Sequence, residues 1–266
     1  DDKAGMAALF EMARRLKEKN VAHGTIQFII TAGEESGLVG AKELDPSKII
    51  AKYGFAVDSD GKVGGIVVAA PFQAKVFAKV IGKKAHAGVA PEKGISAITV
   101  AAKAVAQMNL GRLDEETTAN IGRFEGGQAT NIVCDEVNIL AEARSIDEAK
   151  LNAQTAHMKE TFERVAKENG ARAEVEVKLM YPGFSVTEDD QVVKIAKAAV
   201  EAVDRTPLLG ISGGGSDANV IAGFGIPTVN LSVGYEEIHT TNERMPIEEL
   251  EKLADLLEAI IIETSK

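Results

Sequence analysis

The stretch Thr25-Ile26-Gln27-Phe28-Ile29-Ile30-Thr31 leads directly into Ala32-Gly33-Glu34-Glu35, so a β-forming run ends at two adjacent carboxylates. Its branched and aromatic side chains predict a buried strand over residues 25–31. Ligands of α/β sheets gather at the carboxyl ends of strands, where both glutamates would lie. Adjacent side chains diverge there, so one could hold a metal ion while the other accepts a proton. A solvated loop with two ordinary glutamates is the alternative interpretation.

The surrounding pattern predicts an α/β domain. Apolar residues recur at helical spacing over residues 2–19, where acids at the start and bases near the end suit the helix dipole. A short strand over residues 53–57 ends at Asp58. After residue 181 the alternation resumes with a helix over residues 188–203, a strand over residues 228–231 and a final amphipathic helix.

Residues 72–181 follow a different pattern, which predicts a second domain inserted into the first. Helices are expected over residues 95–110 and from a Ser145/Glu148 capping box to residue 169. Strands are expected over residues 73–81, 117–124, 136–144 and 175–179. The order βαββαβ is that of the ferredoxin-like unit. We therefore expect one domain over residues 1–71 and 182–266, with the inserted domain over 72–181.

Composition indicates an ordinary globular protein. The chain has 266 residues, of which 45% are hydrophobic, and a net charge of −10. Without a basic run or a long apolar run, we expect neither a nucleic-acid partner nor a membrane partner. A single cysteine, Cys134, excludes an internal disulfide and favours the cytoplasm. Because the chain opens on Asp1-Asp2-Lys3 without a methionine, we expect a fragment or a trimmed chain.

Further metal-binding residue types lie at the same predicted sheet edge. Asp58 ends one strand, Asp1 opens the helix beside it, and His239 follows the strand that ends near Leu231. Carboxylates with one imidazole are suitable ligands for zinc, and also for cobalt or manganese. Each residue alone has an ordinary structural explanation. Their placement at one edge favours a metal site.

The chain resembles the peptidase T-like branch of the di-zinc aminoacylase and exopeptidase superfamily. The matching motifs run through the chain in order: Asp1 to Gly5, Gly33-Glu34-Glu35, Val57-Asp58, Gly126-Gly127 to Asn131, Gly214 to Asp217, and His239 to Asn242. The resemblance implies a zinc-exopeptidase-like three-layer α/β catalytic domain with an inserted ferredoxin-like lid and dimerisation domain. It also implies two divalent metal ions, zinc in the first instance, a small peptide substrate and a homodimer formed through the lid.

The resemblance also implies roles for individual residues. Asp1 would bridge the two metal ions, Glu35 and His239 would complete the ligands of one, and Asp58 would bind the other. Glu34 would be the general base. His86 would stabilise the oxyanion across the dimer interface. Further implied substrate contacts are Asn131 and Arg144, at the substrate's carboxylate end, and Gly214 and Ser216, in a glycine-rich loop lining the pocket.

Two departures from the family pattern limit this transfer. The family's first ligand histidine lies in a His-x-Asp motif well before the Asp-Asp-Lys segment, and this chain has no such stretch. Peptidase T also has an arginine where this sequence has Gly213. The second departure weakens any transfer of strict tripeptide specificity.

Cleavage of a peptide bond in a small peptide, as in a tripeptide aminopeptidase, is the function that these residues favour. A dipeptidase, or an amidohydrolase or deacylase of the same superfamily, is the first alternative. Because the histidine motif is missing, a non-catalytic binding or dimerisation fragment is the second alternative. The run from Gly210 to Gly214 matches the nucleophile elbow of a serine hydrolase, with Ser212 as nucleophile, but no aspartate is clearly placed to complete a triad.

Overall fold

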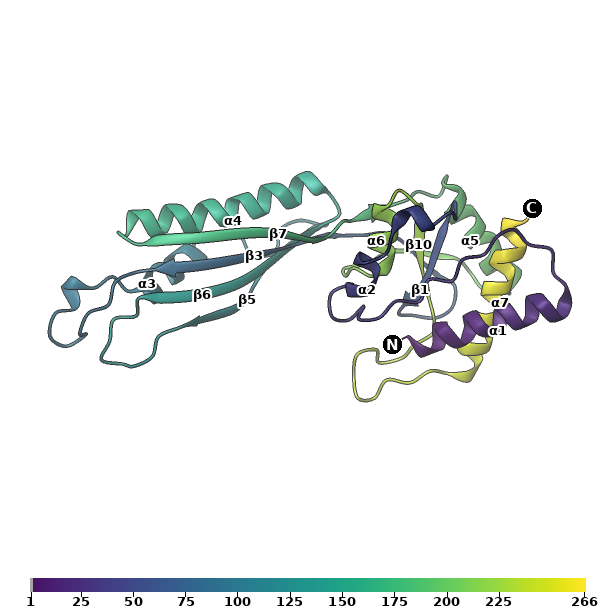
Figure 1. Cartoon of the computed structure of the whole chain (residues 1–266), viewed down its shortest axis with the longest axis horizontal. Coiled ribbons are helices and arrows are strands. Elements are labelled where there is room, and N and C mark those ends of the chain that lie inside the picture. Colours follow the sequence, from purple (N-terminus) through teal and green to yellow (C-terminus); the bar gives the residue numbers. More distant parts are fainter. Residues whose placement is uncertain (1) are drawn as a thin grey trace. The chain divides into compact units, whose positions relative to one another are not determined.

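The computed structural model describes residues 2–266, which form two compact units, each built on its own sheet (Figure 1). One unit combines the chain up to Ala70 with Gly183–Lys266. The other is Pro71–Pro182. Across residues 2–266, no helix combines the length and apolar character needed to cross a bilayer.

The sheet of the first unit brings the end of one strand beside the end of another. Its order is β1-β10-β2-β8, with β9 also paired to β2. β1 and β10 run parallel, with Val57 opposite Leu231, so their carboxyl ends lie side by side. The five strands are β1 (Gly54–Ser59), β2 (Gly65–Ala70), β8 (Phe184–Ser185), β9 (Leu208–Ile211) and β10 (Thr228–Ser232).

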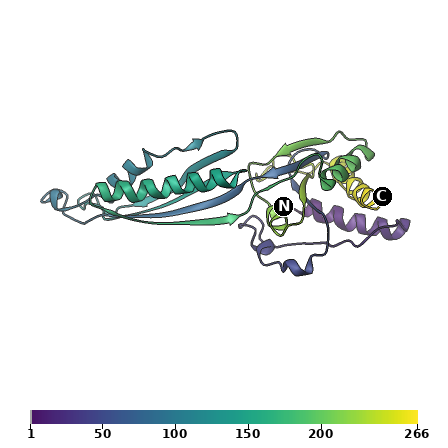
Figure 2. The ribbon, with the colours of Figure 1, turned by 90° about the horizontal axis from the view of Figure 1, so that it is seen from above.

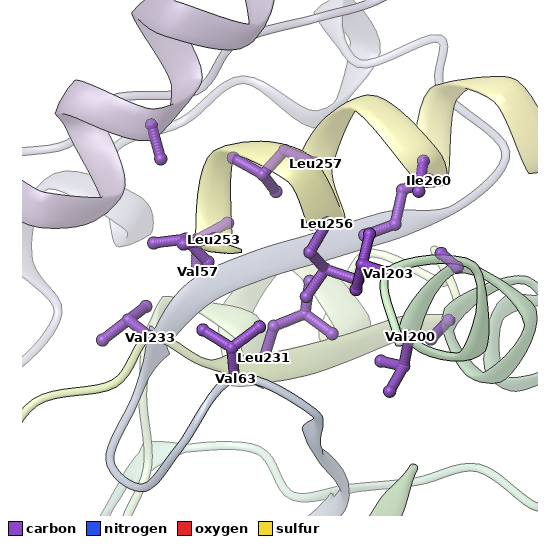
Figure 3. Close-up of a cluster of buried hydrophobic side chains, with 14 of the residues drawn as sticks. Val57, Val63, Val200, Val203, Leu231, Val233, Leu253, Leu256, Leu257 and Ile260 are labelled. Atoms are coloured by element: carbon purple, nitrogen blue, oxygen red, sulfur yellow. The ribbon is translucent and has the colours of Figure 1, made fainter. Parts of the chain in front are cut away.

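Helices cover both faces of this sheet, which gives three layers. Val57 packs in a core with the helices α1 (Lys3–Lys19), α5 (Gln191–Ala202) and α7 (Ile247–Thr264), and Figure 3 shows part of this core. Its neighbour Ala56 packs instead against residues of α6 (Asp217–Gly223). Successive residues of a strand point to opposite faces, so α6 lies on the other side of the sheet, with the short helix α2 (Val39–Lys42) against it.

The prediction of a buried strand over residues 25–31 is wrong. This segment has no regular secondary structure and pairs with no strand of the described residues, and Phe28 and Ile30 are 44% and 50% exposed. The side chain of Gln27 instead ties it to the backbone of Lys48, Ile50 and Ala51. A hollow of about 920 Å³, lined by residues of this segment, β1 and α7, lies beside it. A strand requires a neighbouring backbone within hydrogen-bonding distance, and the hollow separates this one from β1.

The second unit is an antiparallel sheet in the order β4-β5-β6-β3-β7, with α3 (Ala97–Val105) and α4 (Glu148–Glu168) packed together and against it (Figures 1 and 2). The strands are β3 (Phe72–Ile81), β4 (Gly111–Arg112), β5 (Thr117–Gly126), β6 (Glu136–Ser145) and β7 (Arg172–Tyr181). Apart from the two-residue β4, the chain order is βαββαβ, and the sheet order is that of a ferredoxin-like unit.

The start of α4 differs from the predicted capping box. Asp147 is the N-cap, and its carboxylate accepts hydrogen bonds from the backbone N–H groups of Ala149 (2.7 Å) and Lys150 (3.1 Å). Ser145 is fully buried at the end of β6, where its hydroxyl bonds to that of Thr117 (3.0 Å). The Ser145/Glu148 prediction is therefore wrong, because Ser145 belongs to the strand.

Replacing Asp147 by alanine tests this assignment. Asp147→Ala leaves two helix N–H groups without their acceptor, and we expect it to lower the free energy of unfolding by about 1 kcal/mol in urea denaturation. Glu148→Gln is the control and should change stability by less than about 0.5 kcal/mol. An unchanged free energy of unfolding in Asp147→Ala would contradict the Asp147 cap.

Candidate metal centre

Glu34 and Glu35 lie in a tight turn that follows residues 25–31. Gly33 has a φ of +74°, which favours glycine, and the carbonyl of Glu34 accepts backbone hydrogen bonds from Gly37 (2.9 Å) and Leu38 (2.8 Å). The turn gives the two glutamates different environments. Glu34 is partly buried, whereas the side chain of Glu35 is 57% exposed.

Glu35 contacts His239, although 204 residues separate them in the chain. The distance between Glu35 Oε1 and His239 Nε2 is 3.1 Å. His239 lies in a hairpin loop closed by two backbone hydrogen bonds between Glu236 and Arg244. It adopts a left-handed φ of 62°, and its N–H donates to the carboxylate of Glu243 (3.0 Å). The loop thus holds the imidazole in a defined place.

Asp58 is fixed by a buried asparagine on the neighbouring strand. The backbone N–H of Asp58 donates to Asn230 Oδ1 (3.1 Å), and the amide of Asn230 donates to the hydroxyl of Ser216 (3.2 Å). Ser216 is buried and caps α6, accepting also from the N–H of Ala218 (3.3 Å). Because this hydroxyl is engaged inside the protein, a contribution of Ser216 to a substrate pocket would come from its backbone.

Two carboxyl groups in this region have strongly raised pKa values. Burial, followed by the charges of Glu35 and Asp217, raises the pKa of Glu34 to about 7, and His239 opposes the shift. Burial, followed by the charges of Glu34, Asp2, Glu35 and Asp217, raises the pKa of Asp58 to about 7. These mutual effects require the five acids to lie close together, although they come from distant parts of the chain.

Asp217 adds a buried oxygen with no hydrogen-bond partner to this group. Its Oδ2 accepts a hydrogen bond from the hydroxyl of Thr31, just before the Glu34 turn. Its Oδ1 is buried and, within residues 2–266, has no partner. An unsatisfied buried carboxylate oxygen is costly unless a donor or a cation reaches it.

The donor set of this cluster fits a divalent cation. In the part of the chain that the structure describes, no lysine or arginine forms an ion pair with Asp2, Glu34, Asp58 or Asp217. Carboxylates with one imidazole are ligands of the type that zinc, cobalt and manganese accept. The described residues do not bring three such side chains within metal-binding geometry of one another. Asp1, the predicted bridging ligand, lies outside the described residues.

His86, Asn131 and Arg144 belong to the second unit. His86 is exposed and its segment pairs with that of Asn131, through a bridge to Ile132 and a bond from the N–H of Ala87 to the carbonyl of Asn131 (2.9 Å). Arg144 lies on β6, where its Nε donates to Glu142 (2.9 Å). Their predicted roles towards a substrate stay predictions.

The serine-hydrolase alternative gains no support from the local geometry. The hydroxyl of Ser212 accepts a hydrogen bond from the N–H of Gly214 (3.0 Å). No hydrogen bond within residues 2–266 joins it to a histidine. A nucleophilic serine requires a base in hydrogen-bonding reach.

Sequence reasoning missed the residues that hold this cluster together. Asn230 is a polar residue inside an apolar strand, and Tyr235 is a buried aromatic residue whose hydroxyl contacts Asp2. A buried amide or phenol usually has a hydrogen-bond partner, so an asparagine and a tyrosine inside apolar stretches indicate buried hydrogen bonds. The identity of each partner required the three-dimensional structure.

The raised pKa values predict how stability depends on pH. Without metal, the folded protein binds protons at Glu34 and Asp58 more tightly than the unfolded chain does. The corresponding stability is present below about pH 4 and is lost as the pH rises through about 7. With a chelator present, we expect urea denaturation to show a free energy of unfolding that decreases from pH 5 to pH 8.

The double variant Glu34→Gln/Asp58→Asn should flatten this decrease. Glu125→Gln is the matched control, because Glu125 is an exposed acid of the second unit whose pKa is lowered by Arg123. In this control the free energy of unfolding should decrease with pH as steeply as in the unsubstituted chain. An unchanged slope in the double variant would contradict the assignment of the two groups.

Comparisons with known proteins identify the family of the chain. The family model for peptidase family M20/M25/M40 matches residues 1–263. The solved structure of aminopeptidase PepT from Bacillus cereus has a TM-score of 0.95 and 69% identity, over all of this chain and 71% of its own. A solved tripeptidase from Staphylococcus aureus has a TM-score of 0.96 and 52% identity, with the same coverage.

A curated relative extends the similarity at lower identity. Peptidase T of Fusobacterium nucleatum is 30% identical over 98% of this chain, which spans 64% of that protein. The chain thus corresponds to about two thirds of these relatives in length. With a family model that matches almost its whole length, the chain belongs to peptidase family M20/M25/M40.

Proposed function

We propose that the protein hydrolyses the peptide bond of short peptides at a centre holding two divalent metal ions, with Glu34 as the general base. Its membership of an M20 peptidase family and its similarity to proteins named aminopeptidase PepT and tripeptidase support the reaction class. We propose Asp1, Glu35, Asp58 and His239 as metal ligands, with Asp1 bridging. Zinc is the first candidate metal, and cobalt or manganese would suit the same donors.

The observation that carries this proposal is the unequal environment of the two adjacent glutamates. Glu35 is exposed and already contacts His239, a second potential ligand, at 3.1 Å. Glu34 is partly buried, and the pKa of its carboxyl is raised to about 7. A general base works best when its pKa lies near the operating pH. This difference supports the proposal of Glu35 as metal ligand and Glu34 as general base.

The proposed reaction balances with Glu34 as a proton carrier. When bound, the two ions would polarise the scissile carbonyl and acidify the attacking water. Glu34 removes a proton from that water as its oxygen forms a bond to the carbonyl carbon. The carbon–nitrogen bond then breaks, and Glu34 returns the proton to the leaving amine nitrogen. The new carboxylic acid gives up its remaining proton to the amine, so the products are a carboxylate and a protonated amine.

The substrate is proposed as a small peptide, and a tripeptide is the first candidate. Gly213, in place of the arginine of peptidase T, argues against strict tripeptide specificity, so dipeptides and N-acyl amino acids belong in the same screen. We further propose that the second unit acts as a lid and forms a homodimer. In that unit His86 would donate to the oxyanion, while Asn131 and Arg144 would bind the substrate's carboxylate. The single cysteine supports a cytoplasmic location.

Adjacent substitutions separate the two glutamates' roles. Glu34→Gln removes the base but leaves the ligands, so we expect kcat for a tripeptide to fall by about 10²–10⁴-fold while metal content is retained. Glu35→Ala is the matched variant and should lose bound metal as well as activity. Metal content by plasma mass spectrometry and hydrolysis by amine release provide the two readouts. A Glu34→Gln rate near that of the unsubstituted protein would show that the base is assigned wrongly.

Removal of metal tests the reaction class. A chelator should abolish peptide hydrolysis, and added zinc, cobalt or manganese should restore it, because no other group of the site can polarise the carbonyl as strongly. A serine-reactive phosphonate should leave the activity unchanged. Full activity in chelator, together with labelling of Ser212, would instead support the serine-hydrolase alternative.

A further inference from the structure

The carboxylate of Asp2 is held by hydrogen bonds from two separate segments. Its Oδ1 accepts from the backbone N–H of Gly5 (2.7 Å) and from the hydroxyl of Tyr235 (2.5 Å). The fit around it is close. A Cβ at Gly5 would lie 1.9 Å from Asp2 Oδ2 and 2.7 Å from the carbonyl oxygen of Val57, so only glycine leaves room there. Asp2 is therefore fixed beside the residue that precedes Asp58.

Tyr235 is itself anchored on its other side. It is buried, and it directly precedes the Glu236–Arg244 hairpin that carries His239. At the preceding residue, Gly234 has a φ of +100°, and a Cβ there would lie 2.3 Å from that of Glu249. Glu249 is also buried, and accepts hydrogen bonds from the N–H of Val63 and from Arg205, each at 2.8 Å. The phenol therefore extends from a rigid point towards Asp2.

The Tyr235–Asp2 hydrogen bond thus joins three segments that carry proposed ligands. Asp2 is the neighbour of Asp1 in the chain, its carboxylate lies at the end of β1 beside Asp58, and Tyr235 begins the loop of His239. A neutral donor suits this place. A lysine or arginine would also satisfy Asp2, but its positive charge would offset the negative charge that attracts cations to the cluster.

We propose that Tyr235 is a positioning residue of the metal centre, whose hydroxyl sets the separation between Asp2 and the His239 hairpin by holding the carboxylate of Asp2. The inference rests on the proposed function, because it assigns Tyr235 to the same metal centre. Tyr235 touches neither substrate nor metal in this scheme. It acts through Asp2, as outer-shell hydrogen bonds do in other metal sites.

Tyr235→Phe removes only the hydroxyl, and Tyr53→Phe is the matched control. Tyr53 packs against the same hydrophobic core but lies before β1, away from the cluster. The first readout is the dissociation constant for zinc, by competition with a chromophoric chelator. We expect Tyr235→Phe to weaken zinc binding by about 10-fold or more, the usual effect of losing an outer-shell partner. Tyr53→Phe should bind zinc as the unsubstituted chain does.

Two further readouts separate positioning from general loss of stability. Bound cobalt(II) should show an altered visible absorption spectrum in Tyr235→Phe, because the ligand geometry changes. Amide hydrogen exchange over residues 236–244 should be faster in this variant and unchanged in the core helix α7. Asp2→Asn, which keeps an acceptor oxygen, should retain most of the affinity. Asp2→Ala, which also removes the acceptor of the Gly5 N–H, should weaken zinc binding at least as much as Tyr235→Phe, and adding Tyr235→Phe to it should cause no further loss.

The outcomes distinguish this inference from the function on which it rests. If the unsubstituted chain binds zinc or cobalt and Tyr235→Phe binds it equally, with the same spectrum and exchange, Tyr235 has no positioning role and the metal centre stands. If the unsubstituted chain binds neither metal, the proposed metal centre itself is refuted. Additive losses in the Asp2→Ala/Tyr235→Phe pair would show that the two residues act independently, contrary to the inference.

Discussion

The crowding of negative charge at one edge of the first sheet is the constraint on which the proposed site depends. Asp2, Glu34, Glu35, Asp58 and Asp217 come from four parts of the chain, and burial, followed by their mutual charges, raises the pKa values of Glu34 and Asp58. Such repulsion disfavours the folded state unless something compensates it. Within residues 2–266 the compensation comes from the apolar packing of the α/β core and from neutral hydrogen-bonding groups, since the only ion-pairing partner of these five acids is His239. The charge is thereby left available for cations.

Neutral hydrogen-bonding groups explain how the cluster keeps its shape. The side-chain oxygen of Asn230 accepts from the backbone N–H of Asp58, while the hydroxyls of Thr31 and Tyr235 donate to Asp217 and Asp2. Asn230 lies on β10 and Tyr235 packs in the same core, so the positions of Asp58 and Asp2 follow from the packing of the fold. A fold that placed lysine or arginine here would be better balanced electrostatically as a metal-free protein, but it would compete with any metal for the same oxygens.

Sequence patterns predicted those features that depend on local periodicity or on strongly polar residue types. The amphipathic α1 and the ferredoxin-like order of the second unit follow from such patterns, whereas the pairing of Glu35 with His239 was implied by the family resemblance. The strand over residues 25–31 failed because β propensity cannot supply a partner strand, and the Ser145 cap failed because the strand β6 includes that serine. Asn230 and Tyr235 were missed because a buried polar group reveals its role only through its partner, which lies far away in the sequence.

Anomalous X-ray scattering at the zinc absorption edge, from crystals grown with zinc, tests the central claim most directly. The account predicts anomalous peaks within about 2.0–2.2 Å of the carboxylate oxygens of Glu35 and Asp58, and at a similar distance from an imidazole nitrogen of His239. Glu34 should lie beside these peaks without ligating them. Peaks confined to other surface carboxylates, or direct ligation by Glu34 in place of Glu35, would contradict it.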